Sequence, residues 1–260
     1  SDISYRPFPL PHFYVEESSI ISNKVDLTDL SNVKKLKIFI SQKNFFKRND
    51  LKILDLSIDQ TNFSLNFERL KYFTNLFTNS FSEKKILVRN SSFTFSDKEK
   101  TVFINLLRNL EFFFDNQTGL NKFIMKSEIF NVPYEFIFEN DLTNKSSSIK
   151  ITSKKLNFNF LNNIDLTKNG ITELNIFNIK LSNKFSVNQN EIKFISDKSS
   201  TINYSGNLNL KPFSANVVLD LKKVQIGDIL NNPILIELLK SNILFNRNLD
   251  VKLKLNINQL

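Results

Sequence analysis

Apolar and polar residues alternate with a period of two over most of this chain. In the segment 202–221 the apolar residues fall on even positions up to Leu210 and on odd positions from Phe213 onward. Successive side chains of a β-strand point to opposite faces of the sheet, so the pattern predicts strands with one polar and one apolar face. The change of phase at Lys211 and Pro212 predicts a tight turn or a bulge that keeps both runs on the same apolar side.

Similar runs recur between short polar segments along the whole sequence. Counting them gives on the order of 14 to 18 predicted strands, among them 54–58, 63–67 and 249–257. Residues 120–138 predict two strands around a turn at Asn131 to Pro133. The segment 101–114 fits either a helix or a strand, and we predict a strand. No alternation of strands and helices is visible, which favours one continuous antiparallel meander over a parallel sheet.

Two segments follow a helical period instead. Residues 67–81 follow Asn66, a plausible cap, and residues 231–242 begin with Asn232 as a cap and Pro233 in the first turn. In the first segment the residues that share one helical face are Leu70, Phe73, Phe77 and Phe81. About two short amphipathic helices are therefore predicted beside the strands.

Three of the six prolines, Pro7, Pro9 and Pro11, stand at alternate positions near the start of the sequence. Such spacing removes backbone donors and enforces an extended chain, so it predicts an edge strand or a polyproline-like lead-in. Apolar residues around the prolines, Phe8, Leu10 and Phe13, suggest that this segment packs against the body of the protein.

The composition narrows the chemistry. Cysteine is absent and His12 is the one histidine, so disulfides, cysteine-rich zinc sites and thiol catalysis are excluded, and we expect His12 to serve packing. Neighbouring acids such as Glu16 and Glu17 are expected to lie on the solvated surface and not to form a catalytic pair. Phosphate-binding glycine motifs are missing from the sequence. We therefore predict no enzyme, no cofactor and no metal site.

The chain carries 35 lysines and arginines against 26 acids, a net charge of +9, which favours an anionic partner such as nucleic acid or a phospholipid surface. The lysines are spread over polar faces beside Asp, Glu or Asn and form no dense basic cluster. This distribution argues against nucleic acid. No run reaches the roughly 18 to 20 apolar residues that cross a bilayer.

The apolar faces of so many predicted strands must be buried in a core or covered by a ligand. A closed sandwich or a barrel would bury them, whereas a long sheet curled into a gutter would leave them available to apolar ligands. About 15 strands at a spacing of about 4.8 Å would make a gutter on the order of 70 Å long. A lining of Phe, Leu, Ile and Val suits acyl chains.

The sequence also resembles the AsmA-like family. The stretch "YRPFPLPHFYVEESSI" at 5–20 is similar to the segment that follows the membrane anchor in those proteins. Residues 205–257 resemble their recurring unit of strand, "KPF" turn, strand, "VQIGDIL" entry, short helix and strand. Residues 36–96 are similar to their paired strand units, so the resemblance covers most of the chain.

The resemblance implies a single elongated domain over 1–260, part of a longer protein of the Gram-negative envelope that is anchored in the inner membrane by an upstream segment and extends into the periplasm. It further implies, as in TamB-like and YhdP-like relatives, a role in moving phospholipid between membranes and in outer-membrane assembly. The expected partners are phospholipid, an anionic membrane surface and other envelope proteins.

The leading hypothesis is a non-enzymatic lipid-transfer module, and the alternative is a structural or interaction scaffold whose apolar faces are buried or paired with a partner's strand. Under the first hypothesis the groove is lined collectively. The predicted lining residues are Phe177, Ile179, Leu181, Leu208, Leu210, Phe213, Val217, Leu219, Leu249, Val251, Leu253 and Leu255.

Overall fold

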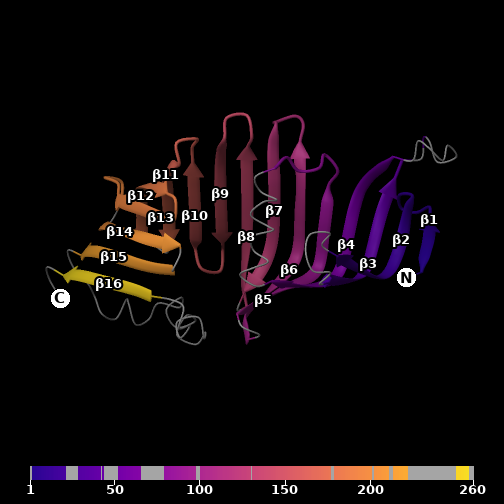
Figure 1. Cartoon of the computed structure of the whole chain (residues 1–260), viewed down its shortest axis with the longest axis horizontal. Coiled ribbons are helices and arrows are strands. Elements are labelled where there is room, and N and C mark those ends of the chain that lie inside the picture. Colours follow the sequence, from indigo (N-terminus) through magenta and orange to yellow (C-terminus); the bar gives the residue numbers. More distant parts are fainter. Residues whose placement is uncertain are drawn as a thin grey trace. The chain divides into compact units, whose positions relative to one another are not determined.

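The computed structural model describes residues 2–21, 29–41, 43, 52–65, 79–97, 100–129, 131–176, 179–200, 202–210, 213–221 and 250–257. These residues form sixteen β-strands, and their order in the sheet is the order of the chain (Figure 1). The sheet does not close on itself. The mainly β fold predicted from the alternation is confirmed.

The chain divides into two compact units, Ser1–Thr143 and Asn144–Leu260. The strands of the first unit are β1 (Ile3–Arg6), β2 (His12–Ile21), β3 (Asp29–Ile40), β4 (Ile53–Leu65), β5 (Ile86–Asp97), β6 (Lys100–Asp115), β7 (Leu120–Ile129) and β8 (Val132–Asp141). Those of the second are β9 (Ser146–Ser153), β10 (Phe158–Ile164), β11 (Asn169–Ile176), β12 (Ile179–Asn188), β13 (Glu191–Ser196), β14 (Asn203–Leu210), β15 (Phe213–Leu221) and β16 (Asp250–Ile257).

The expectation of a purely antiparallel meander is wrong at two places. Strands β4 and β5 pair in parallel, as do β15 and β16. Parallel neighbours need a long crossover connection, which is usually helical. The two connections are the segments that hold the predicted helices.

Those helices lie almost wholly outside the described residues. No α-helix occurs in the described ranges, and the predictions at 67–81 and 231–242 fall on 66–78 and 222–249, which are not among them. Residues 79–81 are described and are not helical. The two helices therefore stay predictions.

A buried amide holds the segment that precedes β5. Asn121 on β7 is fully buried; its Oδ1 accepts the backbone N–H of Phe81 at 2.8 Å, and its Nδ2 donates to the carbonyl of Asn79 at 2.8 Å. The ring of Phe81 meets that of Phe112 edge to face at 5.8 Å between centroids. These contacts hold Phe81, which the periodicity places at the end of a helix, in irregular backbone that belongs to no helix or strand.

Three residues with left-handed backbone change the phase of the alternation in the first unit. Glu17, Gln60 and Asn90 have φ angles of 47°, 57° and 47°. The residues just before Gln60 and Asn90, Asp59 and Arg89, pair with each other. The sheet therefore carries an aligned row of irregular backbone across these strands, at which each strand switches its inward positions from one parity to the other.

This switch keeps one face apolar on both sides of the row. Ile58 precedes Gln60 and Phe63 follows it, yet both pack against the same buried cluster of Val88, Leu107, Leu110 and Met125. The sequence predicted separate strands at 54–58 and 63–67. The structure shows one strand, β4, whose phase changes inside it.

The proline segment departs from its prediction. Pro7, Pro9 and Pro11 lie in the connection between β1 and β2, and the edge strand β1 ends before them at Arg6. Phe8 and Leu10 are exposed and do not pack on the body of the protein, whereas Phe13 on β2 is half-buried with its ring against Tyr5. His12 is buried and lies 2.7 Å through its Nδ1 from the carbonyl oxygen of Leu10, with its ring against Phe39. The packing role predicted for His12 is confirmed.

Candidate functional site

The register of the second unit places its apolar residues on one face. Residues directly opposite each other in paired strands point to the same side of the sheet. Leu210 pairs with Phe213 and Leu208 with Ala215, so the apolar runs of β14 and β15 lie on one side, as predicted. Lys211 and Pro212, where the sequence predicts the turn or bulge, lie outside the described residues. The opposite face carries mostly Asn, Ser, Lys and acidic residues.

The predicted lining residues that lie in described strands all belong to this apolar face. The pairings connect them from strand to strand between β12 and β16. They are Ile179, Leu181, Leu208, Leu210, Phe213, Val217, Leu219, Val251, Leu253 and Leu255. Phe177 and Leu249 lie outside the described residues.

These side chains are accessible to different degrees. Leu181, Leu208, Val217 and Leu219 are half-buried, and Leu253 on β16 is 57% exposed. None of these five has the exposed fraction of a core residue. They form an apolar surface rather than a sealed interior.

Two glycines and two phenylalanines shape the middle of this face. Gly170, Phe185, Phe194 and Gly206 stand in one row across β11 to β14. The ring of Phe185 occupies the space over Gly170, and the ring of Phe194 lies 2.7 Å from the point where a Cβ on Gly206 would stand. The two rings therefore lean away from each other, because each covers a neighbour without a side chain.

A shallow hollow of about 320 Å³ opens beside these rings. All of its lining residues belong to the apolar face, and six of them are Phe160, Leu174, Leu181, Phe185, Ile192 and Phe194. The remaining four are uncharged and polar: Asn162, Thr172, Asn183 and Tyr204. Of the ten residues around this hollow, only Leu181 is among the lining residues predicted from the sequence. The alternation of apolar and polar residues in 158–164 and 191–196 already indicated that Phe160, Ile192 and Phe194 share one face.

The polar members form hydrogen-bonded pairs. Asn162 Nδ2 donates to Thr172 Oγ1 at 2.9 Å, and the Tyr204 hydroxyl donates to Asn183 Oδ1 at 3.2 Å. Partial burial raises the pKa of the Tyr204 hydroxyl, so it stays protonated as a donor near neutral pH. The hollow thus has an apolar wall and a small set of placed polar groups, which is the usual chemistry of a ligand pocket.

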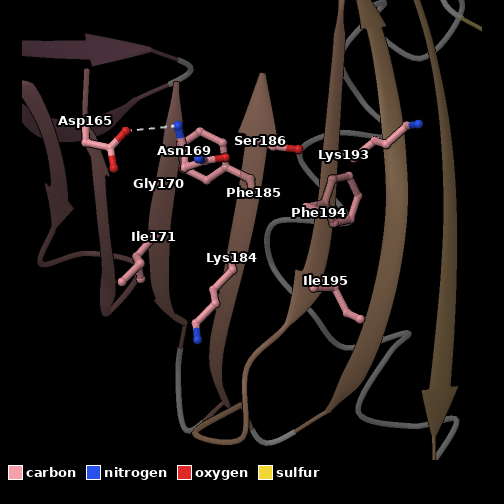
Figure 2. A pocket seen from close by; sticks show the side chains of 10 residues that line it. All are labelled: Asp165, Asn169, Gly170, Ile171, Lys184, Phe185, Ser186, Lys193, Phe194 and Ile195. Atoms are coloured by element: carbon pink, nitrogen blue, oxygen red, sulfur yellow. Dashed lines mark hydrogen bonds between the residues drawn. The ribbon is translucent and has the colours of Figure 1, made fainter. Parts of the chain in front are cut away.

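A second hollow, of about 510 Å³, lies along β11 to β13 (Figure 2). Its row Ile171, Lys184 and Ile195 belongs to the polar face, because these residues pair with one another across the three strands. Ile171 and Ile195 are exposed. Figure 2 shows Lys184 and Lys193 extending toward opposite ends of these strands.

Metal and membrane-span signals are absent from the part of the chain that the structure describes. There, no three or more His, Cys, Asp or Glu side chains gather in a way that could hold a metal ion. No helix within the same ranges is long and apolar enough to cross a bilayer.

Comparison with family models, with curated protein sequences and with solved structures gave no match. The resemblance to AsmA-like proteins therefore stays a prediction from the residues quoted above.

Proposed function

We propose that this protein is a non-enzymatic carrier of phospholipid acyl chains, which lie on the apolar face of the second unit while the headgroups stay in water. The observation that carries the proposal is the register. It gathers the apolar residues of β10 to β16 on one side of an open sheet and leaves many of them half-exposed. Apolar surface that remains in contact with water favours binding of hydrocarbon by about 25 cal/mol for each Å² covered.

The uncharged lining fits this ligand. None of the residues around the smaller hollow is charged, so the hollow suits chains and not phosphate. The cellular setting that we propose, transfer between inner and outer membrane in the periplasm together with outer-membrane assembly, rests on the sequence resemblance alone.

The opposite face supports the second proposed partner, an anionic membrane surface. Lys184 stands between the exposed side chains of Ile171 and Ile195, a combination that suits headgroups and the upper acyl region together. The fraction of the protein that sediments with phosphatidylglycerol vesicles should fall when Lys184 and Lys193 are changed to Glu. It should stay unchanged in the matched K150E/K154E variant, and equal loss in both variants would contradict this contact.

Lipid transfer tests the main proposal. The purified protein should carry phospholipid in native mass spectrometry and move a fluorescent phospholipid between vesicles. In the triple variant L181D/L208D/V217D, transfer should fall by about tenfold or more, because each carboxylate must be dehydrated beneath the chain.

The control places the same three charges on the other face of the same strands, in S186D/S205D/N216D, and should retain transfer between uncharged phosphatidylcholine vesicles within about twofold. Circular dichroism checks that both variants keep their strands. Unchanged transfer in the first variant would contradict the proposal. Absence of lipid from the wild-type protein would favour the alternative, a scaffold in the cell envelope that pairs its edge strands with a partner.

A further inference from the structure

A row of uncharged polar side chains crosses the apolar face of the second unit. Asn162 on β10 stands opposite Thr172 on β11, Thr172 opposite Asn183 on β12, and Asn183 opposite Ser196 on β13. Tyr204 on β14 reaches this row through its hydroxyl, which donates to Asn183. At a strand spacing of about 4.8 Å the row is roughly 19 Å long from β10 to β14.

Apolar strips flank the row on both sides. On one side lie Phe160, Leu174 and Leu181, and on the other lie the rings of Phe185 and Phe194. Polar groups surrounded by apolar surface are costly to dehydrate unless they find hydrogen-bond partners. A ligand that covered this face with hydrocarbon alone would strip water from the row and replace none of its bonds.

The hydrogen bonds within the row stop at its centre. Asn162 bonds to Thr172, and Tyr204 bonds to Asn183, whereas the described contacts include none between Thr172 and Asn183, although the two stand directly opposite each other. The hydroxyl hydrogen of Thr172 and the amide hydrogens of Asn183 are therefore donors that face the hollow of about 320 Å³. Donors without a cation suit an uncharged acceptor such as a carbonyl oxygen.

From this geometry we infer that the hollow is a binding site for the ester carbonyls of a diacyl glycerolipid, with Thr172 and Asn183 as donors and the acyl chains on the flanking strips. The inference rests on the proposed lipid-carrying function and adds to it which part of the lipid is recognised.

The test compares two lipids with the same chains and headgroup. Dioleoyl phosphatidylcholine has two ester carbonyls, and its dialkyl ether analogue has none. We expect the full chain to bind the ester lipid about three- to tenfold more tightly, the range that one or two hydrogen bonds provide. This preference should weaken in T172V, which keeps the shape of the side chain, and in N183L, because each change removes one of the two donors, whereas S186A on the opposite face should keep it in full.

Each outcome decides the inference. Equal binding of both lipids by the wild-type chain would overturn the carbonyl site and leave the lipid-carrying function intact. Binding of neither lipid would overturn both. A preference for the ester lipid that is undiminished in both T172V and N183L would exclude these two donors as its cause. T172V serves alone if N183L does not fold.

Discussion

Thr61 shows most clearly at the scale of single residues how the first unit handles polar groups. Its side chain is fully buried, and its hydroxyl oxygen has no hydrogen-bond partner among the described residues, while its backbone N–H donates to Ser91 Oγ at 3.0 Å. A buried hydroxyl without a partner costs about 1 to 3 kcal/mol compared with a hydrated one. The residue is held by its neighbours and not by its own hydroxyl.

Two substitutions at this contact should have opposite effects. T61V removes the unpaired hydroxyl at nearly constant volume, so the free energy of unfolding should stay the same or rise by up to about 1 kcal/mol. S91A removes the acceptor of the Thr61 N–H and should lower it by about 1 to 2 kcal/mol. Urea unfolding measures both. A clear loss of stability in T61V would show that the hydroxyl has a partner.

A second effect at this scale depends on pH. Asp115 ends β6, and its carboxylate lies 2.8 Å from Lys122 Nζ and accepts the backbone N–H of Gln117 at 3.0 Å. The Lys122 contact is the largest cause that holds the pKa of Asp115 at about 2, below its ordinary value of 3.8. Asp165 makes a similar turn with Thr167, which lowers its pKa as well.

A carboxyl group whose pKa is lowered by folding stabilises the native state fully above its ordinary pKa and loses this contribution as the pH falls through the folded value. The turn at Asp115 should therefore weaken between about pH 4 and pH 2. A titration of the carboxyl carbon by NMR should give a midpoint near 2, and D115N should remove the corresponding part of the acid dependence of stability. A midpoint near 3.8 would contradict the contact with Lys122.

At the scale of elements, the row of Glu17, Gln60 and Asn90 explains where sequence analysis succeeded and where it failed. Alternation found nearly every strand, because one face of each is apolar. It divided β4 into two strands, because a left-handed residue shifts the apolar positions by one and mimics a break. Gln60 carries no local signal for that conformation, since glycine and asparagine are the residues that usually adopt it.

The left-handed backbone at Gln60 leads to a prediction about the stability of variants at this position. Q60G should keep or raise the free energy of unfolding, by up to about 1 kcal/mol, because glycine adopts a positive φ without strain. Q60V should lower it by about 1 to 2 kcal/mol, because a β-branched side chain is strained there. Thermal unfolding of the two variants gives the comparison. Equal stabilities would mean that the strand can relax at this position.

The parallel pairing of β4 with β5 and of β15 with β16 could not be predicted from the sequence for another reason. Whether a strand pairs with its predecessor in parallel depends on the path of the connection, and alternation within a strand carries no information on its direction. The segments 67–81 and 231–242 did carry a hint, since a helix between two strands is the usual crossover.

At the scale of the whole molecule, the sequence predicted which residues share the apolar face of the second unit, but it did not predict the smaller hollow on that face. The ten described residues that are predicted to line the groove share one side of the sheet, because the period of two and the antiparallel pairing of β14 with β15 determine it. The hollow could not be predicted, because it depends on which residues face one another across five strands. Gly170 beside Phe185 and Thr172 beside Asn183 are pairings between strands, and register is not visible in one strand alone.

The strand order has a consequence for cooperativity. In the described part of the chain every strand pairs only with its neighbours in the sequence, so no backbone ladder ties an early strand directly to a late one within a unit. Such a molecule behaves as a quasi-one-dimensional array, whose stability is a sum of strand terms and neighbour interfaces. Heat should open it in stages from its edges, so the calorimetric enthalpy of unfolding should exceed the van't Hoff enthalpy, and hydrogen exchange should slow from the edge strand β1 toward β6 and β7.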